Sequence, residues 1–331
     1  MDKLNIEIYI VVYMGKKKAL LLTEGMHGMI SQVEGMAKAL NAVYSHKIVR
    51  LSFPWSLIPP KYTPISQIIL KDKMYLTEDE APDLIISCGR KSVIPSIILK
   101  KNNPKIFTIH IQNPKVNLKN FNLVIAPEHD NLNGDNVISS KGAIHYITES
   151  EINKAKYYLD NKIKSQKIVS LILGGPNKYY SFNSSQLIKI FNKVRSSFIE
   201  KGFKVIVIPS MRTPKSIIDL AIKEFKEDGY VLNSIDKQAY LSSFQIASYI
   251  IVTCDSTSMI SEAATSGKPI FIAHMENKKN NYRFKKFYEL FKTMGITRDL
   301  GEKVEIWNYK KFNEAERISS LINDKVKLWN L

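Results

Sequence analysis

Short apolar runs alternate with helical stretches along most of the chain, and this alternation limits the possible folds more than any other feature. Runs such as ALLLT (19–23), DLIISC (83–88) and KIVSLILGG (167–175) are apolar almost throughout and lack the period-two polarity of a half-exposed strand. Strands that are buried on both faces and separated by helices belong to parallel sheets with helices on each side. The sequence therefore predicts an α/β fold of the doubly wound type.

The same rhythm occurs twice, which predicts two domains. A polar helix at 148–166 closes the first series of strands, and the second series starts at residue 167, so the break falls near residues 160–167. A length of 331 residues suits two domains of about 150 residues each. We expect Rossmann-like domains at 1–160 and 167–300 that face one another across a cleft. A tail helix is expected within 301–331, and its return to the N-terminal domain is one option.

The chain is strongly basic, with 48 Lys and Arg against 31 Asp and Glu and a formal net charge of +17. Two interpretations stay open. Only seven of the basic residues are Arg, which is typical of compositional drift towards Lys. Alternatively, a functional basic face attracts an anionic membrane surface or phosphate-bearing ligands. No RNA- or DNA-binding module accompanies the charge, so nucleic acid is not an expected partner.

Cysteine content and the N-terminal sequence indicate a compartment. Cys88 and Cys254 form neither a disulfide framework nor a ligand cluster, which favours a reducing environment and predicts no metal site. The apolar part of the N-terminal stretch is about nine residues long, too short for a membrane-spanning helix, and it lacks a signal-peptide cleavage site. We expect a cytoplasmic protein, with peripheral association to the inner face of the membrane as a further option.

In doubly wound folds, ligands bind beyond the carboxyl ends of the strands, where helix N-termini present unpaired N–H groups. In the second half, Gly174 and Gly175 follow a buried strand and could bring backbone N–H groups against a diphosphate. Arg212 follows the next strand and offers a planar fork for phosphate, unless it interacts with a neighbouring helix end. Thr213 and Pro214 predict a helix start, with a capping Thr followed by proline at the first helical position.

The stretch TCDSTSMISEAATSG (253–267) places several hydroxyl groups and one carboxylate where a strand gives way to a helix. Ser256 and Ser258 can cap the helix or donate to phosphate oxygens. Glu262, about two turns into the helix, could accept hydrogen bonds from the hydroxyls of a ribose. Capping accounts for one hydroxyl only, so we favour a ligand site that also includes Ser261.

The first half offers a second group of polar strand ends. Gly25 and Gly28 form a GxxG spacing ahead of a helix, which is neither the dinucleotide fingerprint nor a phosphate-binding P-loop. A plain strand-to-helix turn with Gln32 exposed is the alternative. Another strand ends in an acid, an imidazole and an acid, which indicates a proton shuttle or a solvated polar turn; these residues are Glu128, His129 and Asp130.

The stretch NKKNNYRFKKFYELF (277–291) interleaves basic and aromatic residues. It is typical either of a basic amphipathic helix on a membrane surface or of a helix with core aromatics and solvated lysines. Arg283 at the start of this helix is expected to face the cleft.

An ordered series of motifs resembles the elongated-mitochondria (mitochondrial fission) family over residues 18 to 310. The motifs are TEGMHGMISQ, PDLIISCGRKS, IHIQNPK, LVIAPEHD, LGGPNKYY, SMRTP, TCDSTSMISEAATSGKP and RFKKFYELF. The second half of that family is similar to GT-B glycosyltransferases. The resemblance implies a donor nucleotide-sugar site at Gly174, Gly175, Arg212, Thr213, Ser256, Ser258, Ser261 and Glu262. It implies an acceptor side at Glu24, Gly25, Gly28, Gln32, Arg90, Gln112 and Arg283, with Glu128, His129 and Asp130 as the candidate base region.

Together, these features predict a GT-B-like protein that binds a nucleotide-sugar between two domains. We expect a glycosyltransferase that needs neither a metal nor a separate cofactor and acts on a cell-envelope acceptor, which a lipid carrier would hold at the membrane. One alternative is a non-enzymatic adaptor that recruits a dynamin-like partner to a membrane, as the family resemblance implies. A nucleoside-diphosphate-sugar epimerase is a third option.

Overall fold

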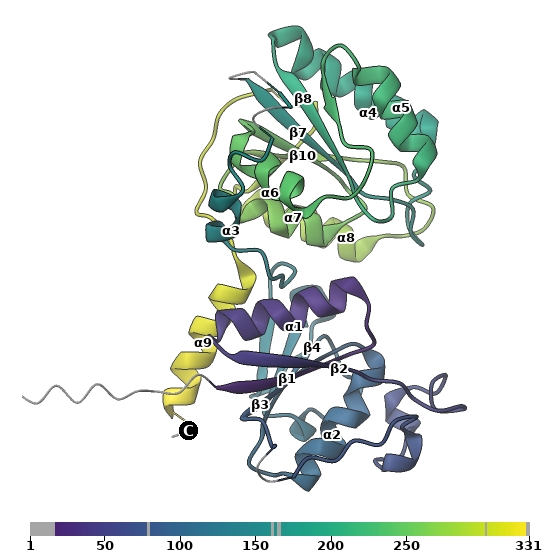
Figure 1. Cartoon of the computed structure of the whole chain (residues 1–331), viewed down its shortest axis with the longest axis vertical. Coiled ribbons are helices and arrows are strands. Elements are labelled where there is room, and N and C mark those ends of the chain that lie inside the picture. The colour runs from purple at the N-terminus through teal and green to yellow at the C-terminus, as the bar shows by residue number, and fades with distance from the viewer. Residues whose placement is uncertain (1–16, 78–79, 160–161, 164–166, 302, 329–331) are drawn as a thin grey trace, which may run out of the picture.

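The computed structural model describes residues 17–77, 80–159, 162–163, 167–301 and 303–328. Two lobes lie one above the other, each built on a six-stranded sheet whose strands are all parallel (Figure 1). The first sheet has the order β2 (Val43–Ile48), β1 (Lys18–Thr23), β3 (Leu84–Cys88), β4 (Phe107–Ile111), β5 (Leu123–Pro127) and β6 (Val137–Ser140). The second has the order β12 (Thr297–Asp299), β11 (Ile270–Ala273), β10 (Tyr249–Thr253), β7 (Ile168–Leu173), β8 (Lys204–Pro209) and β9 (Gly229–Val231).

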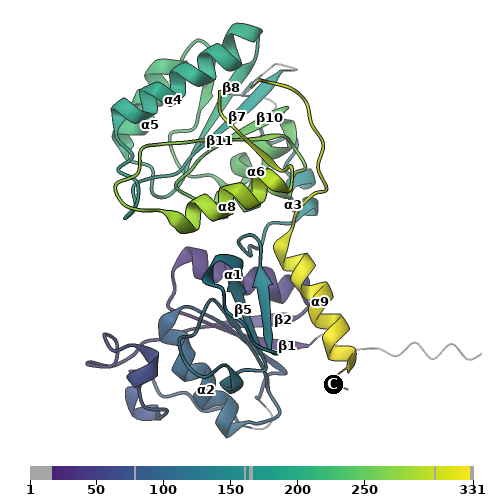
Figure 2. The same ribbon diagram turned by 180° about the vertical axis from the view of Figure 1, so that it is seen from behind.

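Helices connect many of the parallel strands and cover both faces of each sheet, whereas β2–β3, β4–β5 and β5–β6 are joined by loops with 3₁₀ turns. The first lobe contains α1 (His27–Ala39) and α2 (Val93–Asn102), and α3 (Glu149–Lys154) begins the passage to the second lobe. The second lobe contains α4 (Ser184–Ser197), α5 (Lys215–Phe225), α6 (Lys237–Ile246), α7 (Thr257–Ala264) and α8 (Tyr282–Thr293). From both sides of the molecule, α8 is seen on the edge of the second lobe that faces the first, and α1 lies on the opposing edge (Figures 1 and 2). The predicted α/β fold with two doubly wound sheets is confirmed.

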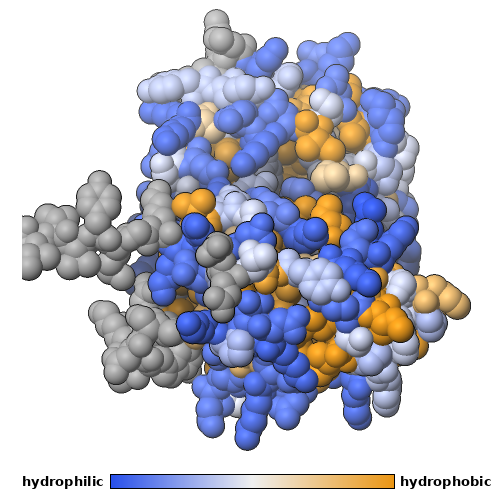
Figure 3. Space-filling view, turned by 60° about the horizontal axis from the view of Figure 1, so that its bottom comes forward, coloured by the Kyte–Doolittle hydropathy of each residue, from blue (hydrophilic) through white to orange (hydrophobic). Residues whose placement is uncertain are grey.

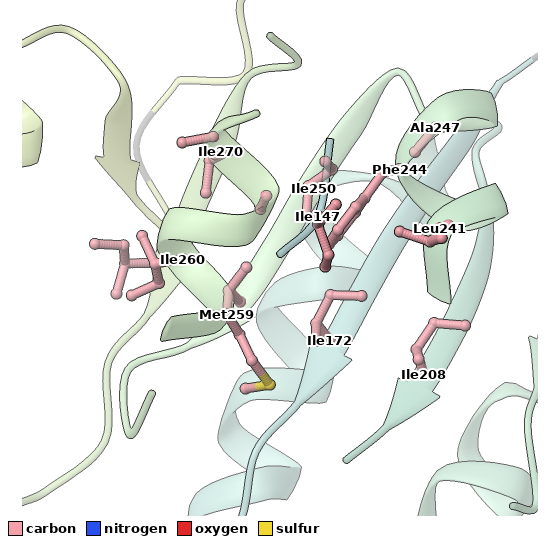
Figure 4. Packing of buried hydrophobic residues seen from close by; sticks show 14 of the residues in the cluster. Ile147, Ile172, Ile208, Leu241, Phe244, Ala247, Ile250, Met259, Ile260 and Ile270 are labelled. Carbon is pink, nitrogen blue, oxygen red and sulfur yellow. The ribbon is translucent and has the colours of Figure 1, made fainter. Parts of the chain in front are cut away.

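The central strands alternate their side chains between two buried faces, which explains their largely apolar sequences. In β7, Ile168 and Ile172 join one hydrophobic cluster, whereas Val169, Leu171 and Leu173 join the cluster on the other face. Figure 4 shows the first of these clusters, in which residues of β7, β8 and β10 pack against α6 and α7. A strand with both faces buried carries mainly apolar residues, and the polar side chains that β4 buries, Thr108 and His110, have hydrogen-bond partners in Asn122 and Ser87.

The chain ends in the first lobe. Phe312 still packs in the core of the second lobe, and the following helix α9 (Glu314–Leu328) places Ala315, Ile318 and Ile322 in the core of the first lobe. Both views show α9 alongside α1 (Figures 1 and 2). Because α9 follows the second lobe in sequence, this packing adds a second covalent connection between the lobes.

One predicted boundary is wrong by several residues. The polar helix expected over 148–166 is helical only as α3, and part of the predicted span lies outside the described residues. Local sequence patterns define such ends poorly because the last turn of a helix depends on tertiary contacts.

Candidate functional site

A hollow of about 350 Å³ lies between the two lobes at the carboxyl ends of the strands. The first lobe lines it with Gln32, Gln112, His129, Asp130 and the segment 140–144, and the second lobe with Thr257, Ser258, Arg283 and Phe287. The structure therefore brings Gln32, Gln112, His129 and Asp130 together with Ser258 and Arg283, although these residues are up to 251 positions apart in the sequence.

An ion pair crosses this hollow. Asp130 Oδ1 lies 3.3 Å from Arg283 Nη2 and 3.7 Å from His129 Nε2, and neither contact has hydrogen-bond geometry. The carboxylate is nearly buried, whereas 61% of the Arg283 side chain is exposed. Arg283 therefore keeps most of its donors available to a ligand.

The surroundings of His129 favour its neutral form by lowering its pKa. Burial lowers the pKa of its imidazole, and Arg283 and Lys286 lower it further, against the opposing effect of Asp130. A neutral imidazole beside a carboxylate is suited to accept a proton at neutral pH. His129 is part of a short 3₁₀ turn at the end of β5, Glu128–Asp130, which sets these three residues at the edge of the sheet.

Gln112 has an unusual backbone. Its φ angle is 85°, a value that residues other than glycine rarely adopt, and its N–H donates to the carbonyl of Ile125 at 2.7 Å. Such strained backbone positions gather at functional sites. Gln112 thus lines the hollow with a left-handed backbone conformation, which the sequence pattern of β4 does not predict.

The backbone N–H groups of Gly174 and Gly175 are not free. This corrects the prediction that they would bind a diphosphate. Gly174 N–H donates to Thr253 Oγ1 at 2.8 Å, and Gly175 N–H donates to Asp255 Oδ2 at 2.9 Å. A Cβ atom on Gly174 would lie 2.0 Å from Asp255 Oδ2, and one on Gly175 would lie 2.1 Å from the carbonyl oxygen of Arg212. The two glycines are needed because the loop packs directly against these groups.

Asp255 is the centre of this arrangement and was missed as a site residue. Its fully buried carboxylate accepts hydrogen bonds from Gly175 N–H, Thr253 Oγ1 (2.7 Å) and Arg212 Nη2 (2.8 Å). Burial raises the pKa of Asp255, and these three donors oppose the rise. An aspartate directly after an apolar strand was the available signal in the sequence.

Arg212 therefore uses part of its guanidinium for contacts within the protein. Besides its ion pair with Asp255, its Nη1 donates to the carbonyl of Gly175 at 3.0 Å. Its side chain is 41% exposed, so the outer edge of the guanidinium remains accessible. The prediction that Thr213 caps the helix is wrong, because Pro214 occupies the cap position of α5. The Thr213 hydroxyl instead donates to the carbonyls of Leu173 and Gly174.

The serines around α7 divide into three roles. Ser256 caps the helix by accepting from Met259 N–H at 3.4 Å, and Ser258 lines the hollow. Ser261 is fully buried, accepts from Ala143 N–H at 2.9 Å and donates to the carbonyl of Thr257. Its hydroxyl thus joins the two lobes and is not available to a ligand, which corrects the prediction of Ser261 as a donor-site residue.

Glu262 faces a different neighbour. Tyr240 donates to its Oε2 at 2.6 Å, and burial raises the pKa of Glu262 to about 7 despite this hydrogen bond. Burial raises the pKa of Tyr146, and the nearby charge of Glu262 raises it further. Tyr240 was not predicted, and no local motif marks it.

Four of the expected acceptor-side residues lie outside the lining of the hollow. Arg90 donates to the carbonyls of Ser56 and Ile58 at 2.6 and 2.9 Å, so its guanidinium fastens a loop. Glu24 pairs with Lys91 through the backbone N–H and the ammonium group. Gly25 has a φ angle of 86° in the turn before α1, and Gly28 lies in the first turn of that helix.

The stretch 277–291 is resolved in favour of the core interpretation. Phe287, Tyr288 and Phe291 of α8 are buried in the second lobe. None of the helices in the described ranges has the length and apolar content that crossing a bilayer requires. The described residues also contain no group of three or more His, Cys, Asp and Glu placed to hold a metal ion.

Two stacked lobes with parallel sheets and a hollow at their facing strand ends define a protein of the GT-B-like class. Solved structures agree: the UDP-GlcNAc 2-epimerase of Methanocaldococcus jannaschii has a TM-score of 0.50 at 15% identity, covering 94% of this chain and all of that one. The Neisseria meningitidis enzyme, solved with UDP-GlcNAc, has a TM-score of 0.50 at 12% identity, covering 95% and 93%. These similarities concern the fold.

The chain belongs to the family described as mitochondrial fission ELM1, whose profile matches residues 27–326. The uncharacterized protein RP120 of Rickettsia prowazekii (strain Madrid E) is 27% identical over 288 residues, covering 75% of this chain and 80% of that protein. The mitochondrial fission protein ELM1 of Arabidopsis thaliana is 23% identical over 287 residues, covering 77% of this chain and 66% of that protein. The resemblance seen in the sequence motifs is confirmed.

Proposed function

We propose that this protein is a nucleotide-sugar-dependent glycosyltransferase whose donor binds between the lobes. The observation that carries the proposal is the single hollow with two unlike walls. The second-lobe wall holds the N-terminus of α7, at Thr257 and Ser258, and the guanidinium of Arg283. The first-lobe wall holds an imidazole with a lowered pKa beside a carboxylate. The second-lobe wall is suited to bind an anionic leaving group, and the first-lobe wall is suited to remove a proton.

The donor diphosphate is assigned to the α7 N-terminus and Arg283. The first N–H groups of a helix have no acceptor within the helix, and their dipoles favour an anion. Arg283 supplies planar donors and reaches the same hollow from α8. Arg212 and Glu262, the other predicted donor residues with charged side chains, do not line the hollow, so they are not part of the proposed donor contacts. Gly174 and Gly175 contribute by shaping the loop.

His129 is the proposed base. As the acceptor hydroxyl oxygen bonds to the anomeric carbon, the bond from that carbon to the diphosphate breaks and the diphosphate keeps the electron pair. The hydroxyl proton passes to His129, and Asp130 stabilises the resulting imidazolium. Gln32 and Gln112 orient the acceptor, which we propose to be a component of the cell envelope. The reaction uses no metal ion in this proposal.

A thermal-shift panel of nucleotide-sugars that includes UDP-GlcNAc tests the proposal. A matching donor at a hundredfold excess over its dissociation constant should stabilise the protein by about 2.7 kcal/mol. Arg283→Ala should weaken this binding by about tenfold or more. Arg298→Ala is the matched control, because Arg298 pairs with Glu305 and stacks on Trp307 outside the hollow. The proposal fails if no nucleotide-sugar stabilises the protein, or if both arginine variants respond alike.

A second candidate is an adaptor that recruits a dynamin-like partner to a membrane. The observation in its favour is the membership in a family named for mitochondrial fission. An adaptor predicts no selective stabilisation by any nucleotide-sugar and unchanged partner recruitment after Arg283→Ala. The less favoured epimerase proposal predicts nucleotide-sugar binding followed by inversion at a sugar carbon without any acceptor, which proton NMR of the sugar would reveal.

A further inference from the structure

Exposed apolar side chains of this protein gather in one segment of the first lobe, residues 53–75, which we term the projecting segment. Of the eighteen large apolar side chains that are exposed in the described chain, six lie there: Phe53, Leu57, Tyr62, Ile65, Ile68 and Tyr75. Phe53 is 81% exposed and Leu57 73%. Both ribbon views show this segment extending sideways from the first lobe (Figures 1 and 2). In Figure 3, apolar side chains lie at the corresponding right-hand edge, beside hydrophilic ones.

The projecting segment is fastened to the lobe by groups other than these exposed side chains. Ile69, Leu70 and Met74 are buried in the core cluster that also contains residues of α2. The Gln67 side chain binds both the N–H and the carbonyl of Met74, and Arg90 holds the carbonyls of Ser56 and Ile58. Since the inward-facing residues already fix the segment, its outward apolar side chains are not required for its packing.

The charges around these side chains indicate what covers them. Between residues 50 and 75 the chain carries Arg50, Lys61, Lys71 and Lys73 against the single acid Asp72, and all four basic residues are exposed. Aromatic and aliphatic side chains among lysines are typical of surfaces that enter the interface of an anionic bilayer. The whole chain, at +17, is attracted to the same surface over a longer range.

We propose that the projecting segment is a membrane-docking surface that inserts Phe53, Leu57 and Ile68 into the interface of an anionic bilayer. Lys61, Lys71 and Lys73 then lie at the level of the lipid phosphates. Arg90 fastens this segment at the carboxyl end of β3, the same edge of the first sheet that lines the interlobe hollow. Docking therefore places this edge of the first sheet near the lipid headgroups. The proposal does not depend on the donor site or on the transferase activity.

Co-sedimentation of the full chain with lipid vesicles tests this surface. The wild-type protein should bind phosphatidylcholine vesicles that contain about one third phosphatidylglycerol. Its binding to pure phosphatidylcholine vesicles should be weaker by a factor of about ten or more. The double variant Phe53→Ser/Leu57→Ser should reduce the partition coefficient on anionic vesicles by about tenfold. Its matched control is Tyr157→Ser/Ile306→Ser, since Tyr157 and Ile306 are 71% and 79% exposed outside the segment. The control should bind like the wild type.

A charge-reversal pair separates local docking from general attraction. Lys61→Glu/Lys71→Glu/Lys73→Glu and Lys193→Glu/Lys201→Glu/Lys223→Glu change the net charge equally, and all six lysines are exposed. The first triple variant should lose about tenfold or more in partition, and the second should lose much less. Circular dichroism should show that every variant is folded. The proposal is overturned if the wild-type protein does not bind anionic vesicles, which is the result expected of a protein-binding surface. It is also overturned if each variant loses as much binding as its control.

Discussion

Replacing Asp255 by alanine should destabilise the second lobe more than any other single change in the strand-end loops. The carboxylate is fully buried and accepts from Gly175 N–H, Thr253 Oγ1 and Arg212 Nη2. Removing it leaves two buried donors without a partner, and each orphaned donor costs about 1–3 kcal/mol. Arg212 is 41% exposed and can be rehydrated, so its lost ion pair adds little.

We therefore expect the free energy of unfolding to fall by about 3–5 kcal/mol in Asp255→Ala. Urea unfolding followed by far-UV circular dichroism measures this difference. Asp219→Ala is the control, because Asp219 forms an exposed pair with Lys215 one turn earlier on α5. That variant should lose less than about 0.5 kcal/mol. A loss below about 1 kcal/mol in Asp255→Ala would refute the assignment of Asp255 as the centre of the loop.

Two further predictions concern the lobe junction and pH. Ser261→Ala removes the acceptor of Ala143 N–H at the junction of the lobes, and should lower the free energy of unfolding by about 1–2 kcal/mol in a urea titration; an unchanged value would contradict the structural role given to Ser261. The folded-state pKa of Glu262 is raised to about 7 from an ordinary value of 4.5, so its contribution to stability is greatest below the lower value and is lost as the pH rises to about 7. Glu262→Gln should therefore flatten the pH dependence of the unfolding free energy in this window, and equal slopes for the two proteins would contradict the raised pKa.

The candidate site shows how far local patterns reach. His129, Asp130 and Ser258 were predicted because each follows a buried strand, and parallel strands deliver such residues to one edge, whereas Gln112 was predicted from the family resemblance. Arg90 follows a strand in the same way, yet its guanidinium binds loop carbonyls. The pattern identified the edge of the sheet correctly but not the atoms that each side chain contacts.

The sequence by itself determined the two parallel sheets, because continuous apolar strands between helices can be buried only with helices on both faces. Tertiary structure alone decided that Asp255 takes the N–H of Gly175, that Asp130 meets Arg283 across the lobes, and that α9 packs on the first lobe. Strands and helices are specified by apolar residues that repeat at short intervals along the chain. Hydrogen-bond and ion-pair partners depend on distances that only the packing of remote segments sets.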